Sequence, residues 1–147
     1  MDYGKCDGQW VPNMYGGSEN LEAVEFIKHF NSILHKMYPG VMTIAKETSA
    51  WPKITVSLDQ DGLGFDYAWN TGFVNDWVAY LKKPYDERMT SLNDLTFSMV
   101  YAYSENYILP VSHNEVYRNG GSLLECIQME KKNKNALLRA LYAYIMC

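Results

Sequence analysis

The chain has 147 residues, a formal charge of −4 at pH 7 and 48% hydrophobic residues. This composition suffices for an ordinary buried core in one compact unit, and it excludes an intrinsically disordered chain. The mildly acidic balance argues against nucleic acid or an anionic membrane as the main partner, because both attract clustered lysine and arginine.

Targeting and redox signals are weak. The first twenty residues lack the basic start and apolar run of a signal peptide, and no apolar stretch approaches the roughly 20 residues that span a bilayer. We therefore expect a cytoplasmic protein without a membrane partner. Cys6, Cys126 and Cys147 are far apart and outside any metal-ligand spacing. They predict reduced structural thiols in place of disulfides or a zinc site. No cofactor is expected.

The first predicted helix runs from Glu19 to Tyr38. Residues 1–18 have the composition of a loop, and Ser18 is the expected N-cap. Apolar residues then recur every three or four positions, which predicts one buried helical stripe that a proline and a glycine end. The stripe comprises Leu21, Val24, Ile27, Phe30, Leu34 and Met37.

Two local patterns contain metal-binding residue types. His29 and His35 are six positions apart and fall on different faces of the helix, so we expect surface histidines. Asp59, Asp61 and Gly62 resemble the start of a calcium loop, but the glutamate that would complete the loop is missing. An ordinary turn is the better interpretation of this segment.

Two apolar runs each lead directly into polar residues. The first is a predicted strand from Val41 to Ala45, and the second is a predicted strand from Tyr107 to Ser112. In a parallel α/β sheet, functional groups lie just past the carboxyl ends of the strands, so these residues are expected to share one rim. They are Lys46 and Glu47 after the first strand, and His113, Asn114 and Glu115 after the second.

The remaining elements complete an alternating pattern. We predict a strand from Gly64 to Asn70 and a helix from Asn75 to Lys83, in which Trp77 faces the core. Leu92 to Ser104 fits either a strand or a helical face, and a helix is chosen because a parallel sheet needs a crossover there. The last helix is predicted from Asn135 to Cys147. This alternation predicts the α/β class, with a parallel sheet covered by helices.

Five segments carry a resemblance to a known family. They are WVPNMYGGSENLEAVEF, TIAKETSAWP, GLGFDYAWNTGFVNDW, LTFSMVYAYSENYILPVSHNEV and LLRALYAY. In these the chain resembles the 1,4-alpha-glucan (glycogen) branching enzymes of the alpha-amylase superfamily. The resemblance implies a partial (β/α)8 TIM barrel, with residues 1–147 as the C-terminal part of the catalytic barrel, truncated at both ends. The three predicted strands would be roughly the fifth, sixth and seventh.

A partial barrel has a physical consequence for folding. It leaves two open sheet edges and one apolar side of the central layer exposed, and both favour aggregation. We therefore expect the isolated chain to be marginally folded at best, and the missing half of the barrel to be required for stable folding.

The resemblance also implies the chemistry. Family members transfer a 1,4-linked glucan segment to a 6-hydroxyl in glycogen biosynthesis, by a retaining reaction that uses two carboxyl groups about 5 Å apart. The attacking aspartate of the family lies on the fourth strand, upstream of this chain. Lys46 stands where the family has its acid/base glutamate, and Asn114 stands where it has its third carboxylate. Glu47 could replace that acid only if the strand has already turned into loop, since neighbours on a strand face opposite sides.

The other candidate residues would contact sugar. The resemblance implies an alpha-glucan partner, either glycogen or a maltooligosaccharide, and His113 matches a family histidine that donates to glucose hydroxyls. Taken alone, a histidine at a strand end is more often structural. For Trp51 and Trp69, stacking on sugar and packing in the fold are equally favoured, and Asp66 can serve either purpose.

Two hypotheses for the function remain open. In the first, the chain is part of a branching-enzyme barrel, and the transferase activity belongs to the complete enzyme. In the second, it is a non-catalytic glucan-binding or remnant protein, because Lys46 and Asn114 replace two catalytic acids. Whether this chain is an enzyme stays open at this point.

Overall fold

The computed structural model describes residues 8–49, 51–111, 117 and 121–146. The chain divides into two compact units, Met1–Ala68 and Trp69–Cys147, where the sequence predicted one. The boundary falls inside strand β2, Tyr67–Trp69. Each unit is described by itself.

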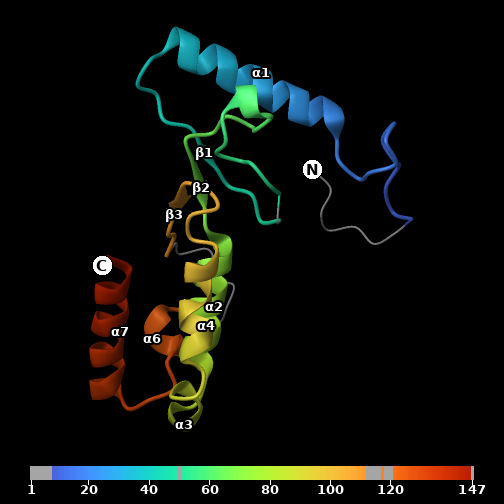
Figure 1. Cartoon of the computed structure of the whole chain (residues 1–147). Coiled ribbons are helices and arrows are strands. Elements are labelled where there is room, and N and C mark those ends of the chain that lie inside the picture. Colours follow the sequence, from blue (N-terminus) through green and yellow to red (C-terminus); the bar gives the residue numbers. More distant parts are fainter. Residues whose placement is uncertain (1–7, 50, 112–116, 118–120, 147) are drawn as a thin grey trace. The chain divides into compact units, whose positions relative to one another are not determined.

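The first helix of the first unit is α1, Leu21–Met37 (Figure 1). Its N-cap is Asn20, whose side chain accepts a hydrogen bond from the N–H of Ala23 at 2.8 Å. The expectation that Ser18 is the cap was therefore wrong, by two residues. The helix ends where Tyr38 donates its N–H to Leu34, just before Pro39 and Gly40 as predicted.

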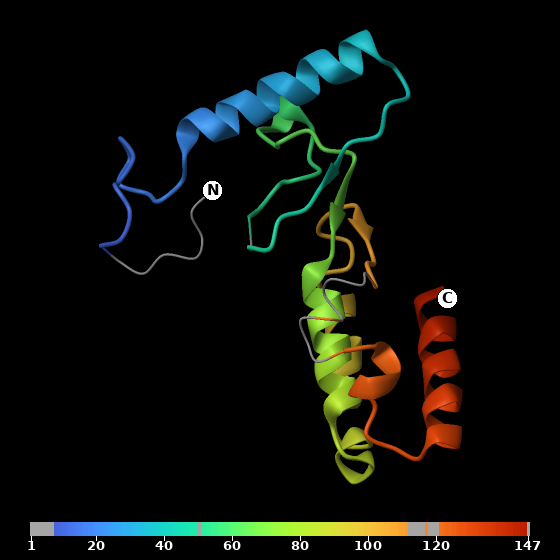
Figure 2. The same ribbon diagram turned by 180° about the vertical axis from the view of Figure 1, so that it is seen from behind.

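The predicted helix α1 is confirmed, but the predicted burial of its apolar stripe is wrong. Asn31 is the buried residue of α1, and its Nδ2 donates to the carbonyl of Leu63 at 2.8 Å. Phe30 and Met37, two members of the stripe, are 48% and 62% exposed. Figure 2 shows the green loop that follows β1 lying beside the middle of α1. Helical spacing thus predicted the element but not how much of its apolar face this unit covers.

Strand β1 and most of strand β2 belong to the first unit. β1, Ile44–Ala45, pairs in parallel with β2, and Ile44 lies opposite Tyr67 while Ala45 lies opposite Ala68. Both strands are shorter than predicted. The connecting loop contains the 3-10 helix η1, Leu58–Gln60, which confirms the ordinary turn expected there. Among the described residues of this unit, the buried apolar ones are Ala45, Ile54, Leu63 and Ala68.

The second unit is mainly helical. Its elements among the described residues are α2 (Thr71–Lys82), α3 (Tyr85–Arg88), α4 (Leu92–Thr96), η2 (Phe97–Val100), β3 (Tyr107–Ile108), α6 (Leu123–Cys126) and α7 (Lys131–Met146). α2 packs against α4 and α6, and α6 packs against α7 (Figure 2). The core consists of Phe73, Val74, Trp77, Val78, Leu81, Cys126, Ile127 and Leu141. The buried position of Trp77, 1% exposed, confirms its predicted role.

Several predicted boundaries in the second unit were wrong. The helix expected over Leu92–Ser104 is a short α-helix followed by a 3-10 turn, and the helix expected to begin at Asn75 begins at Thr71. Both α3 and α6 were not predicted. The mixture of helices with a small parallel sheet nevertheless agrees with the α/β class. Among the described residues, no helix has the length and apolar character needed to cross a membrane.

Candidate functional site

Lys46 and Glu47 follow the carboxyl end of β1, as the sequence predicted. Exposure alternates along this stretch, with Ile44 exposed, Ala45 buried and Lys46 exposed. Glu47 is half-buried, and its Oε1 accepts the backbone N–H groups of Thr48 and Ser49, both at 2.9 Å. The strand has therefore turned into loop at Glu47, and the carboxylate of Glu47 stabilises that turn.

Asp66 lies at the other end of the same strands. Its Oδ2 accepts the backbone N–H of Thr43 at 2.7 Å and the Thr43 hydroxyl at 3.0 Å. It also lies 3.0 Å from Nε2 of His35, which is near the end of α1. Asp66, Thr43 and His35 form a hydrogen-bonded cluster. Because β1 and β2 are parallel, this cluster lies at the amino ends of both strands, whereas Lys46 lies past the carboxyl end of β1.

The electrostatics of this cluster favour the ionised carboxylate. The hydrogen bond from the Thr43 backbone, more than any other contact, lowers the pKa of Asp66 below its ordinary value. His35 is about one-third exposed, which agrees with the expected surface position, and its pairing with Asp66 was not predicted. The structure thus gives Asp66 a joining role between α1, β1 and β2, and its contact with sugar stays a prediction.

Trp69 ends β2 and lies in the second unit. It is half-buried, and the next residue, Asn70, is only 3% exposed. The N–H of Asn70 donates to the carbonyl of Ile108 in β3 at 2.9 Å, while its Oδ1 accepts the N–H of Phe73 at 2.9 Å. Asn70 therefore caps α2 and holds β3 against the end of β2.

Tyr101 lies beside this strand end and packs against two further aromatic rings. The hydroxyl of Tyr101 lies 3.4 Å from Oδ1 of Asn70, and its ring meets those of Tyr107 and Phe97 edge-on at 6.0 and 5.9 Å. Burial raises the pKa of the Tyr101 phenol, and the charge of Asp76 raises it further. Aromatic rings beside hydrogen-bonding groups have the chemistry that sugar rings require.

Sequence reasoning did not identify Asn70 or Tyr101. A signal for Asn70 was present, since asparagine directly before an amphipathic helix is typical of an N-cap. Tyr101 had no such signal, because its position depends on the turn of 3-10 helix η2 that precedes it.

The other predicted site residues divide between the two units. Trp51 is half-buried in the loop after Glu47, in the first unit, whereas Trp69 belongs to the second. His113 and Asn114 lie outside the described residues. Within those residues, no group of three or more histidine, cysteine, aspartate or glutamate side chains is placed to hold a metal ion.

Comparison with known proteins gives matches along the whole chain. No family model matches it. The 1,4-alpha-glucan branching enzyme GlgB of Chlamydia caviae is 50% identical over 147 residues, which are 100% of this chain and 20% of that protein. The enzymes of the same name from Corynebacterium diphtheriae and Chlamydia pneumoniae are 50% and 47% identical over 145 and 146 residues, in each case 99% of this chain and 20% of the relative. The chain thus spans about a fifth of the length of these relatives. The resemblance inferred from its motifs is confirmed.

Proposed function

Because this chain is homologous from end to end to about a fifth of the 1,4-alpha-glucan branching enzymes, we propose that it is a segment of a branching-enzyme catalytic barrel. In this proposal β1, β2 and β3 correspond to the fifth, sixth and seventh strands of a (β/α)8 barrel. The parallel pairing of β1 with β2 supports it, as does the helix that directly follows β2.

The activity proposed for the complete enzyme is the transfer of a 1,4-linked glucan segment to a 6-hydroxyl. This reaction forms a covalent glycosyl intermediate on one carboxylate, while a second carboxyl group protonates the leaving oxygen and then deprotonates the incoming hydroxyl. Alpha-glucan is the proposed substrate class.

For this chain we propose glucan binding without turnover. The observation that carries this proposal is the arrangement after β1. Lys46, which the resemblance aligns with the family's acid/base glutamate, is exposed, and the carboxylate of Glu47 accepts the backbone N–H groups of Thr48 and Ser49. An ammonium cannot supply the negative charge that stabilises an oxocarbenium-like transition state. Asn114, which the resemblance aligns with the family's third carboxylate, also carries no charge.

Two measurements on the purified chain test this proposal. Calorimetric titration with maltoheptaose is expected to give saturable binding, with a cellulose-derived oligosaccharide as the negative control. Iodine staining of amylose is expected to stay constant during incubation with the chain. A fall in staining would show turnover and refute the proposal, as would the absence of any preference for maltoheptaose.

Replacing aromatic residues tests glucan binding separately from turnover. Replacing Trp51 or Trp69 with alanine is expected to weaken maltoheptaose binding roughly three- to tenfold, because one stacked ring is lost. Tyr103→Ala is the matched control, since Tyr103 is 93% exposed and has no predicted sugar contact. Equal losses in all three variants would contradict stacking at the strand ends.

A further inference from the structure

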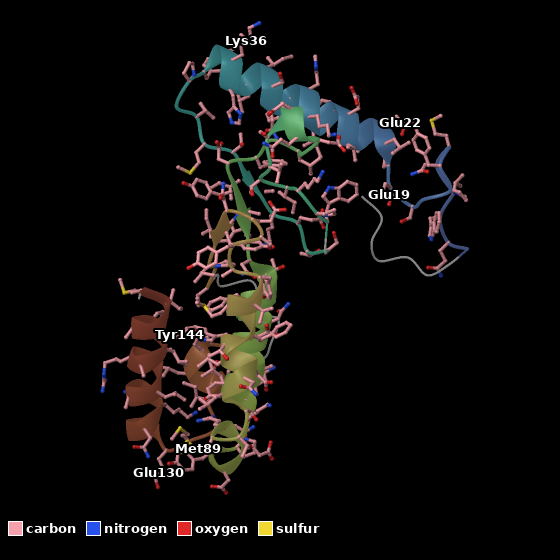
Figure 3. All side chains as sticks on the ribbon, in the orientation of Figure 1. Glu19, Glu22, Lys36, Met89, Glu130 and Tyr144 are labelled. Carbon is pink, nitrogen blue, oxygen red and sulfur yellow. The ribbon has the colours of Figure 1, made fainter. Side chains whose placement is uncertain are left out.

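The second unit contains a cavity of about 600 Å³ that the proposed function does not use. This volume is in the range of small-molecule sites. The residues lining it include Tyr80, Arg88, Met89, Met129, Glu130 and Leu137. Figure 3 shows Met89 and Glu130 at the same end of the unit.

Arg88 is the unusual residue of this cavity. It is only 4% exposed, although it carries a full positive charge. One guanidinium nitrogen, Nη2, donates to the carbonyl of Leu81 at 2.9 Å, while Nε is buried and has no hydrogen-bond partner among the described residues. A carbonyl accepts a hydrogen bond but does not neutralise the charge.

No carboxylate among the described residues pairs with Arg88. Its acidic neighbours Asp86 and Glu87 are exposed, and Glu130, although it lines the cavity, makes no ion pair with the guanidinium. Burial therefore lowers the pKa of Arg88, because the charged form has lost water without gaining an anion. A buried cation of this kind destabilises a fold unless an anion compensates it.

We propose that this cavity is an oxyanion-binding site, in which Arg88 pairs with a carboxylate or phosphate group carried on a small apolar body. The guanidinium offers N–H donors in a planar arrangement that matches both kinds of oxyanion. Met89, Met129 and Leu137 supply the apolar wall for the rest of the ligand. The inference does not rest on the proposed glucan function.

The charge of Glu130 limits the affinity. A carboxylate on the cavity wall repels an incoming anion, so Glu130→Gln is expected to tighten binding roughly two- to fivefold. If Glu130 were instead the internal partner of Arg88, this variant would leave Arg88 without its anion and would unfold more easily. A loss of stability without tighter binding would overturn the proposal.

The direct experiment follows the Nε–H signal of Arg88 by nitrogen–proton NMR in the full chain. Phenyl phosphate, benzoate and inorganic phosphate are the probes at constant ionic strength, and benzyl alcohol is the neutral control. We expect a saturable shift with phenyl phosphate or benzoate and none with benzyl alcohol. The tighter of the two anions identifies phosphate or carboxylate as the preferred group. The absence of a saturable shift with every anion would overturn the proposal, and equal affinity for inorganic phosphate would overturn its apolar part.

Two arginine variants test whether the cavity arginine, and not net charge, binds the anion. Arg88→Met keeps an apolar stem but removes the charge, and it is expected to weaken binding by at least about tenfold. Arg139→Met removes an exposed arginine of α7 and is expected to leave binding unchanged. Equal effects of the two variants would mean that net charge, rather than the cavity, attracts the anion. The wild-type NMR titration decides the question even if Arg88→Met does not fold.

Discussion

Thr43 donates its backbone N–H to Oδ2 of Asp66 at 2.7 Å, at the point where β1 and β2 both begin. The same oxygen accepts the Thr43 hydroxyl and lies 3.0 Å from Nε2 of His35. One carboxylate oxygen therefore connects the end of α1 to the starts of two strands. Since β1 pairs with β2 over only two residue pairs, this side-chain connection matters more than it would in a long sheet.

Replacing Asp66 with asparagine is expected to destabilise the chain by about 0.5–1.5 kcal/mol at pH 7, because the hydrogen bonds to a charged acceptor become neutral. The folded state lowers the pKa of Asp66, so its contribution is complete above the ordinary value near 3.9 and is lost as the pH falls through the lower folded pKa. Urea unfolding of both proteins between pH 7 and pH 2 measures this. The difference between them should shrink below about pH 4.

Asp59→Asn is the control for that comparison, because Asp59 is exposed on η1 in the same unit. It is expected to change stability little at any pH. A difference for Asp66→Asn that stays constant down to pH 2 would mean that the ionised carboxylate is not the stabilising form.

Gly62→Ala is expected to destabilise the first unit by about 1–3 kcal/mol through steric overlap. A Cβ at position 62 would lie 1.9 Å from the carbonyl oxygen of Val56, which is backbone and cannot rotate away. The same oxygen accepts the N–H of Gly64 at 3.1 Å, so displacing it also breaks the turn around η1. Thermal unfolding followed by circular dichroism provides the measurement.

Gly40→Ala separates sterics from backbone strain. Gly40 has a φ of +100°, but a Cβ there would meet nothing within 4 Å. Its expected cost is about 1 kcal/mol, from the unfavourable backbone conformation alone. An equal or larger loss for Gly40→Ala than for Gly62→Ala would contradict the overlap with Val56.

Local signals predicted the helices better than the strands. The spacing of apolar residues located α1 to within two residues at each end, because helix formation depends on near neighbours and on capping. The predicted burial of Phe30 and Met37 failed, because burial depends on what packs against the helix. Helix α6 was missed although Ser122 and Glu125 form a capping box, a pattern that the sequence contains.

The candidate site was predictable only where it follows a strand end. Lys46 and Glu47 were located by the apolar run that precedes them, and the structure places them just past β1. The contacts of Asp66 could not be predicted, because they depend on the register that sets Thr43 beside it. The role of Asn70 depends likewise on β3, a segment 37 residues away in the sequence.

Asn70→Ala is expected to cost about 2 kcal/mol, more than the loss of an exposed helix cap. Asn70 and Asn20 accept equivalent cap hydrogen bonds, at 2.9 and 2.8 Å, but Asn70 is buried and its loss also removes the contact with Tyr101. Asn20→Ala is therefore the matched control, with an expected cost of about 1 kcal/mol. Denaturant unfolding of both variants tests this, and equal costs would show that burial adds nothing to the cap of α2.

Lys46→Glu is the substitution that tests the proposed loss of catalysis. The chain is tested in place of the matched segment of the Chlamydia caviae relative, to which it is 50% identical over 147 residues. With Lys46 the chimera is expected to be inactive. Lys46→Glu combined with Asn114→Asp is expected to restore branching, and the acid/base group at position 46 should by itself raise the rate about 10²–10⁴-fold. Iodine staining of amylose measures this activity.

Glu47→Gln in the restored chimera is the control. Glutamine keeps an oxygen that can accept the N–H groups of Thr48 and Ser49, so the turn and the activity should both survive. If Glu47 is itself the acid, Lys46→Glu gains nothing and Glu47→Gln abolishes the activity. That outcome would move the acid/base position from residue 46 to residue 47. The turn after β1 would then present the carboxyl group of Glu47 to the substrate.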